Sequence, residues 1–245
     1  MNNTKGFTLI EILAALAISL IMLFAIGAAI ESALKSSGGM ERKVIAQQDV
    51  RGALEIMAME IRMASYNPTM TANNSLWVNP ANCGGLSGNP SWKGIQVATA
   101  NSITVEMDIA GDPTGDGNGI IGEPNEIISY NYVRVAPERY ITRDTNCGNP
   151  LNPPAFLGDL STSGRPRTVR VVNVDTNPQT PIFRYFDGQG SQIPFDAAGN
   201  ISDPTQIPNI RMVEITLVVD TDEINPDTHQ RRRMIYSTRE ILRNH

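Results

Sequence analysis

Residues 7–30 read FTLIEILAALAISLIMLFAIGAAI, an apolar stretch of 24 residues with a single charge, Glu11. A helix of this length spans about 36 Å, which exceeds the roughly 30 Å of hydrocarbon in a bilayer. Lys5 is the basic residue ahead of the stretch and Glu31 follows it, so the positive-inside bias places the amino terminus in the cytoplasm. The stretch therefore predicts a single membrane span, with the rest of the chain exported.

Three interpretations of this stretch differ in how they treat its length and its carboxylate. A cleaved secretory signal has an apolar core of about 7–15 residues, which is shorter than the stretch found here. A plain single-span anchor fits the length but leaves Glu11 unexplained, because a carboxylate in an apolar helix is costly without a partner. The third interpretation, a helix that enters a filament core after processing, explains both features.

The residues that open the apolar stretch support the third interpretation. Residues 5–11, KGFTLIE, closely resemble the prepilin motif of type IV pilins and type II secretion pseudopilins, in which a short basic leader and a glycine precede Phe-Thr-Leu-Ile-Glu. The resemblance implies that a prepilin peptidase removes the leader, residues 1–6, by cutting between Gly6 and Phe7, and methylates the new amino terminus. It also implies that Glu11 neutralises the buried amine of Phe7 on an adjacent subunit, a pairing that sets register as well as stability.

Residues 31–66 predict an amphipathic continuation of the helix. Apolar residues recur every three or four positions on one face: Val50, Leu54, Met57, Ile61 and Ala64. Charged residues occupy the other faces: Asp49, Arg51, Glu55, Glu60 and Arg62. This pattern predicts that a globular head covers the apolar face. The helix should end near Tyr66, before Asn67-Pro68, and Ser36-Ser37-Gly38-Gly39 predicts a bend or local melting because each glycine costs about 1 kcal/mol.

Residues 67–245 predict a β-rich head. The runs rich in Val, Ile, Thr and Tyr are 94–98, 102–109, 126–135, 167–173, 182–186, 210–220 and 233–243. Clusters of Gly, Pro, Asn and Asp at 110–125 and 191–208 predict loops between them. The sequence shows no internal repeat and no second long helix. The fold class is therefore α+β, a long N-terminal helix packed on an antiparallel β-sheet head, which is the pilin fold that the resemblance implies.

Two further stretches indicate which members of the pilin family the chain resembles. Residues 125–130, NEIISY, follow an Asp- and Gly-rich insert, and residues 237–244, STREILRN, end the closing hairpin. Both look like the PilW-like minor pilins and are also similar to the larger minor pseudopilin of type II secretion, the GspJ type. The first resemblance implies a minor pilin that helps to start or cap a type IV pilus, with the pseudopilin of a secretion tip as the alternative.

The resemblance also implies a location and partners. The chain would sit in the inner membrane as a single-pass protein with its head in the periplasm, and would then pass to the pilus at the cell surface. Its partners would be the prepilin peptidase, the major pilin, other minor pilins and the inner-membrane assembly platform.

Residues 111–126, GDPTGDGNGIIGEPNE, are the stretch densest in oxygen donors. Aligning this stretch with the EF-hand calcium loop gives five candidate ligands: Asp112, Thr114, Asp116, Asn118 and Glu123. Thr114 departs from the pattern, and strand-like residues flank the loop where an EF-hand has helices. A calcium-holding hairpin loop and a turn with solvated carboxylates both remain open. The calcium loop raises another class of function, a membrane-anchored, calcium-dependent binding or adhesin module, whereas a minor pilin requires no cofactor.

Cys83 and Cys147 stand in the same local context, Asn-Cys-Gly. Export to an oxidising compartment favours a disulfide between them, and closing a loop of 65 residues would contribute about 4 kcal/mol in the chain-entropy model. Two separate buried thiols are the alternative.

Composition argues against catalysis and nucleic-acid binding. The chain has two histidines, His229 and His245, which lie near a loop and the terminus and are expected to be exposed. No Gly-rich phosphate loop, Ser/His/Asp set or Cys/His set is present in the sequence, so we expect a structural protein and not an enzyme. Residues 231–233 are three arginines, but a formal net charge of −5 and the lack of interleaved aromatic residues argue against nucleic acid as a partner.

Overall fold

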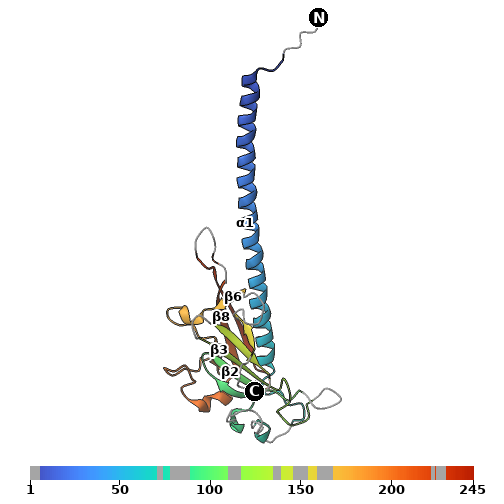
Figure 1. Ribbon diagram of the computed structural model, residues 1–245. Helices are drawn as coiled ribbons and strands as arrows, with labels where there is room; N and C mark the ends of the chain where they lie inside the picture. The colour runs from blue at the N-terminus through green and yellow to red at the C-terminus, as the bar shows by residue number, and fades with distance from the viewer. Residues whose placement is uncertain are drawn as a thin grey trace. The chain divides into compact units, whose positions relative to one another are not determined.

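The structure is a computed structural model that describes residues 6–70, 74–77, 89–109, 117–134, 139–145, 154–158, 168–221, 224 and 230–245 (Figure 1). The chain divides into two compact units, residues 1–45 and 46–245. One helix, α1 (Leu9–Arg62), contributes its N-terminal part to the first unit and its C-terminal part to the second.

The helix is unbroken through residues 36–39, where the sequence predicted a bend or local melting. The prediction of melting was wrong. Two glycines cost about 1 kcal/mol each, and this cost is small because the turns on both sides are already formed and no new nucleation is needed. The helix ends at Arg62, four residues before the predicted end, and a turn follows at residues 63–65.

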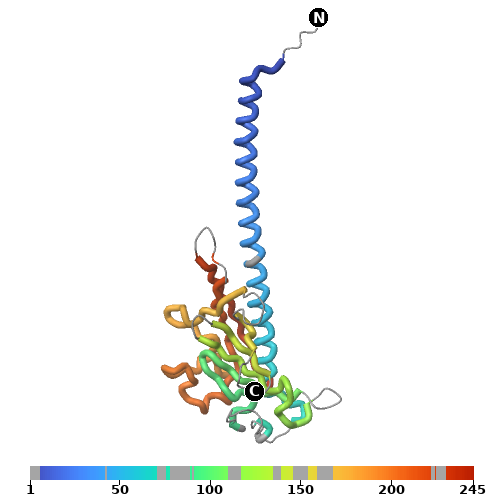
Figure 2. Tube along the Cα trace, viewed as in Figure 1, coloured from blue at the N-terminus to red at the C-terminus, as the bar shows by residue number. Residues whose placement is uncertain are grey.

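The strands of the second unit form two antiparallel sheets. The first sheet has the order β1 (Ile95–Ala98), β2 (Ser102–Glu106), β3 (Ile127–Val133), β4 (Tyr140–Asp144) and β5 (Ala155–Leu157). In the second sheet β8 (Met212–Thr221) pairs with β6 (Val169–Val171), β7 (Phe183–Phe186) and β9 (Arg233–Ile241). The two C-terminal strands, orange-red to red in Figure 2, form the hairpin that closes the chain.

Short 3-10 helices lie between the longer elements: η1 (Asn74–Trp77) and η2 (Pro90–Trp92) between α1 and β1, η4 (Asn173–Asp175) between β6 and β7, and η5 (Pro204–Asn209) between β7 and β8. Asp203 caps η5, because its side chain accepts a hydrogen bond from the N–H of Thr205 at 3.0 Å.

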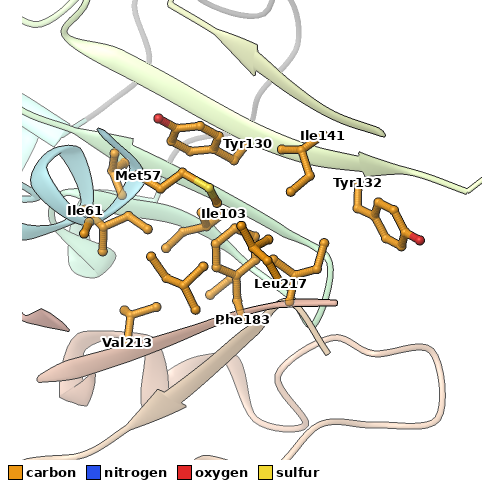
Figure 3. Packing of buried hydrophobic residues seen from close by; sticks show 14 of the residues in the cluster. Met57, Ile61, Ile103, Tyr130, Tyr132, Ile141, Phe183, Val213 and Leu217 are labelled. Atoms are coloured by element: carbon orange, nitrogen blue, oxygen red, sulfur yellow. The ribbon is translucent and has the colours of Figure 1, made fainter. Parts of the chain in front are cut away.

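The hydrophobic core joins the C-terminal part of α1 to both sheets. Met57 and Ile61 of the helix lie against Ile103 of the first sheet and Val213 of the second, and all four are fully buried (Figure 3). The predicted apolar face of the helix is confirmed: Val50, Met57, Ile61 and Ala64 are buried and Leu54 is half-buried. Apolar residues recur on this face at helical spacing, and the face therefore packs against the core of the head.

The predicted α+β class, a long helix with antiparallel strands, is confirmed. All seven predicted strands are present, with somewhat shorter bounds. Three details were wrong. The strands form two sheets instead of one, β4 and β5 were missed, and Glu60, expected on an outer face, is buried.

Candidate functional site

A reciprocal cap fixes the start of α1. The backbone N–H and the hydroxyl of Thr8 both donate to Oε2 of Glu11, each at 2.8 Å, and the N–H of Glu11 donates to Oγ1 of Thr8 at 3.4 Å. This is a capping box, in which residues at N-cap and N3 satisfy backbone donors that the helix cannot. The Thr-x-x-Glu spacing is visible in the sequence, and sequence reasoning missed its capping role. Oε1 of Glu11 makes no hydrogen bond or ion pair within the described residues.

The predicted cleavage point lies just outside this cap. Residues 6–8 are not helical, and both Gly6 and Phe7 are exposed. A Cβ placed on Gly6 would meet no atom within 4 Å. No neighbour within the described chain requires a glycine at this position.

The first unit exposes an apolar helix on every side. Large side chains with more than half of their surface exposed include those at successive positions, Leu20 to Phe24, which point in all directions around the axis. Among the described residues α1 is the one helix long and apolar enough to cross a membrane. Soluble monomers rarely expose continuous apolar surface of this extent. This part of the helix is therefore suited to an apolar surrounding, either lipid or other helices.

A buried carboxylate ties the other end of α1 to the first sheet. Glu60 accepts from Nε of Arg143 at 3.1 Å (Oε1) and 3.0 Å (Oε2), and it also contacts Nη2 of Arg143 and the hydroxyl of Tyr130. Burial, and then the hydrogen bond to Glu60, raise the pKa of Tyr130, so its hydroxyl stays protonated and donates. The cluster couples the helix to β3 and β4.

Two further buried carboxylates lie at the end of β2. Glu106 and Asp108 have no exposed surface. Oε2 of Glu106 accepts from Nε2 of Gln96 at 3.3 Å, and Oδ2 of Asp108 accepts from the N–H of Gly119 at 2.8 Å. The other oxygen of each carboxylate, Oε1 and Oδ1, is buried without a hydrogen-bond partner. Burial raises the pKa of Glu106 to about 8.

The predicted calcium loop is described only in part. Asp112, Thr114 and Asp116 lie outside the described residues. Oδ1 of Asn118 accepts from the N–H of Ile120 at 2.8 Å, and the N–H of Glu123 donates to Glu126 at 2.9 Å, so these contacts do not join the two candidates. Within the described ranges no group of three or more His, Cys, Asp or Glu side chains could hold a metal ion. Cys83, Cys147 and His229 also fall outside the described residues, and the disulfide stays a prediction.

His245 is buried, and the prediction that it is exposed was wrong. Its Nε2 lies 2.9 Å from the carbonyl oxygen of Ile207 and its Nδ1 lies 2.8 Å from Oγ of Ser65. Because a carbonyl only accepts, we place the ring proton on Nε2, and Nδ1 then accepts from the Ser65 hydroxyl. Burial lowers the pKa of His245 to about 4. The hydrogen bond to the Ile207 carbonyl opposes this shift, and the charges of Arg211 and Lys93 add to it.

This buried imidazole predicts a loss of stability in mild acid. An unfolded histidine takes up a proton near pH 6.5, whereas the folded one resists protonation down to its pKa of about 4. The stabilisation is therefore complete above pH 6.5 and is lost as the pH falls toward 4, by roughly 3 kcal/mol in total. Thermal unfolding of the detergent-solubilised protein across this range should show the fall, and His245→Gln should flatten it.

The chain's other histidine provides the control for this experiment. The variant His229→Gln should keep the pH dependence of the wild type. Equal slopes for His245→Gln and the wild type between pH 4 and 6.5 would show that the imidazole does not control acid stability.

Comparison with known proteins identifies the amino-terminal segment. The family model described as the prokaryotic N-terminal methylation motif matches residues 1–27. No curated protein matches the chain. Among solved structures, a type IV-like pilin from Thermus thermophilus is similar at 10% sequence identity and a TM-score of 0.37, over 81% of this chain and 97% of that chain. Residues 1–27, which contain Gly6, Phe7 and Glu11, therefore carry a prokaryotic N-terminal methylation motif at the start of an exposed apolar helix.

Proposed function

We propose that the chain is a minor pilin, a non-enzymatic structural subunit that helps to start or cap a type IV pilus. Prepilin peptidase cuts it after Gly6 and methylates Phe7, and residues 7–30 then hold it first in the inner membrane and later in the filament core. The observation that carries the proposal is the methylation motif at the start of a helix whose large apolar side chains are exposed on every side.

Because its helix exposes large apolar side chains, such a subunit would leave the bilayer only for another apolar environment. Each large aliphatic or aromatic side chain moved out of water contributes about 1.5–3 kcal/mol. Residues 7–30 carry many of them, and the described structure covers none of them with its own residues. Helices of the major pilin and of other minor pilins, delivered by the assembly platform, would supply the missing cover.

In this proposal, Glu11 receives the new amino terminus of a neighbouring subunit. Thr8 of the same chain occupies Oε2, which leaves Oε1 available to a second donor. An amine buried among apolar helices without a partner would cost several kcal/mol. The pair between Glu11 and the amine of Phe7 on the next subunit would therefore fix the axial position of each subunit.

The variant Glu11→Gln tests this function. Glutamine can still accept hydrogen bonds from Thr8, because the capping box tolerates Glu or Gln at this position, so the change removes the charge and leaves the cap. We expect normal membrane insertion and cleavage, with the amount in sheared filaments at least tenfold lower. Immunoblots of the membrane and sheared-filament fractions would measure both quantities.

Glu31 supplies the matched control. It lies on the same helix, is exposed, and pairs with Lys35 at 2.7 Å. Because exposed pairs of this kind contribute little, Glu31→Gln should enter filaments as the wild type does. Equal incorporation of Glu11→Gln and Glu31→Gln would refute the charge-pairing role.

The pseudopilin alternative shares the same motif and helix. A deletion of the gene that abolishes piliation and leaves protein secretion intact would favour the minor pilin, and the opposite result would favour the secretion tip. A membrane-anchored binding module, in contrast, would work without cleavage at Gly6.

A further inference from the structure

Glu106 and Asp108 lie on the same side of one extended segment. The N–H of Met107 donates to the carbonyl of Glu126 at 2.9 Å, so the pairing with the β3 side continues past the end of β2. Side chains at positions i and i+2 of an extended chain point to the same face, about 7 Å apart at their origins. The two carboxylates therefore face one region of the head.

Each carboxylate carries one oxygen that nothing in the described chain satisfies. Neither residue is exposed, and Oε1 of Glu106 and Oδ1 of Asp108 are both buried without a partner. No described lysine or arginine forms an ion pair with either residue. Two carboxylates buried on one face are costly in their charged form, and either a proton or an accompanying cation relieves that cost.

The backbone of Gly117 and Gly119 packs closely against the Asp108 carboxylate. A Cβ added to Gly117 would lie 2.0 Å from Oδ1 of Asp108, so only glycine lets the chain approach this oxygen so closely. The N–H of Gly119 donates to Oδ2 at 2.8 Å and fixes the orientation of the group. The carboxylate is thus positioned before any ligand arrives.

We propose that Oε1 of Glu106 and Oδ1 of Asp108 bind one calcium ion. Oxygen donors without histidine or cysteine favour a hard cation, and calcium accepts irregular sets of six to eight oxygens at about 2.3–2.6 Å. Two acidic side chains are too few to complete the shell, so water and backbone carbonyls provide the other ligands. A site with so few charges binds in the range of about 10⁻⁴–10⁻³ M that is typical of extracellular modules.

These ligands differ from those that the sequence pattern predicted. The EF-hand comparison began at Asp112, whereas Glu106 and Asp108 precede the loop in a stretch with the pattern of a strand. The proposal rests on the two buried carboxylates alone, and it is independent of the pilin function, which a negative result here would leave intact.

Calcium titration of the full-length protein in detergent, after treatment with a chelator, tests the proposal. We expect binding heat and a rise in Tm for the wild type in millimolar CaCl₂. Asp108→Asn and Glu106→Gln should each weaken the affinity at least tenfold while keeping the far-ultraviolet circular dichroism spectrum. Because the two variants are nearly isosteric and independent, a folding defect in one leaves the other as a test.

Asp196 provides the matched control. It is an exposed aspartate whose Oδ1 accepts from the N–H groups of Ala198 and Asn200 at 2.9 Å each, and Asp196→Asn should bind calcium as the wild type does. Absence of both heat and Tm shift in the wild type would overturn the proposal. It would also fail if the double variant Asp112→Asn/Asp116→Asn lost binding while Asp108→Asn and Glu106→Gln kept it.

Discussion

The variant Gly6→Leu should accumulate at full length and be absent from filaments. Nothing in the described chain lies within 4 Å of an added Cβ at this position, so the substitution leaves the fold and the Thr8–Glu11 cap intact. We expect the substitution to impair cleavage, because the peptidase must bring the backbone of residue 6 into its active site. Intact-mass measurement should find wild-type protein without residues 1–6 and with one added methyl group, and the cleaved fraction of the variant should fall at least a hundredfold.

Gly39→Leu is the matched substitution away from the motif. Gly39 also has open space around its Cβ position, but it lies inside α1, 33 residues beyond Gly6. The variant should be cleaved as completely as the wild type. If wild-type protein from cells retained its first six residues, both the processing step and the minor-pilin proposal would be wrong. A membrane-anchored binding module would instead stay functional when Gly6→Leu blocks cleavage.

The features that the sequence predicted correctly are those that local patterns encode. The apolar run of residues 7–30, the helical spacing from Val50 to Ala64 and the alternation in β8 each depend on residues close together in the chain. β4 and β5 were missed for the opposite reason. β5 has only three residues, too few to show an alternating pattern, and it exists as a strand because it pairs with β4.

The buried polar groups were the least predictable part of the candidate sites. Glu60 is three positions from Met57, near the apolar face, but its partner Arg143 lies 83 residues away. His245 is buried because Ser65 and Ile207, at separations of 180 and 38 residues, satisfy its two ring nitrogens. A sequence pattern treats an isolated charge or imidazole as a surface group because it cannot locate such partners.

Glu60→Ala should produce a large loss of stability in the head. The change leaves the guanidinium of Arg143 and the hydroxyl of Tyr130 facing an uncharged cavity, and breaking one side of a buried pair costs about 3–5 kcal/mol. Because 27% of the Arg143 side chain is exposed, water can reach it in part. We therefore expect a value near the lower end, about 3 kcal/mol, which corresponds to a fall in Tm of roughly 6–12 °C for a unit of this size.

Thermal unfolding of the detergent-solubilised chain would measure this loss, with Glu55→Ala as the control on the exposed side of the same helix. The double variant Glu60→Ala/Arg143→Leu separates two causes. If the cost comes from leaving a charge without a partner, removing Arg143 as well should restore part of the stability, since no unpaired charge remains. If the cost comes only from lost packing, the double variant should be at least as unstable as Glu60→Ala. Equal Tm values for Glu60→Ala and Glu55→Ala would contradict the coupling of α1 to the first sheet through this carboxylate.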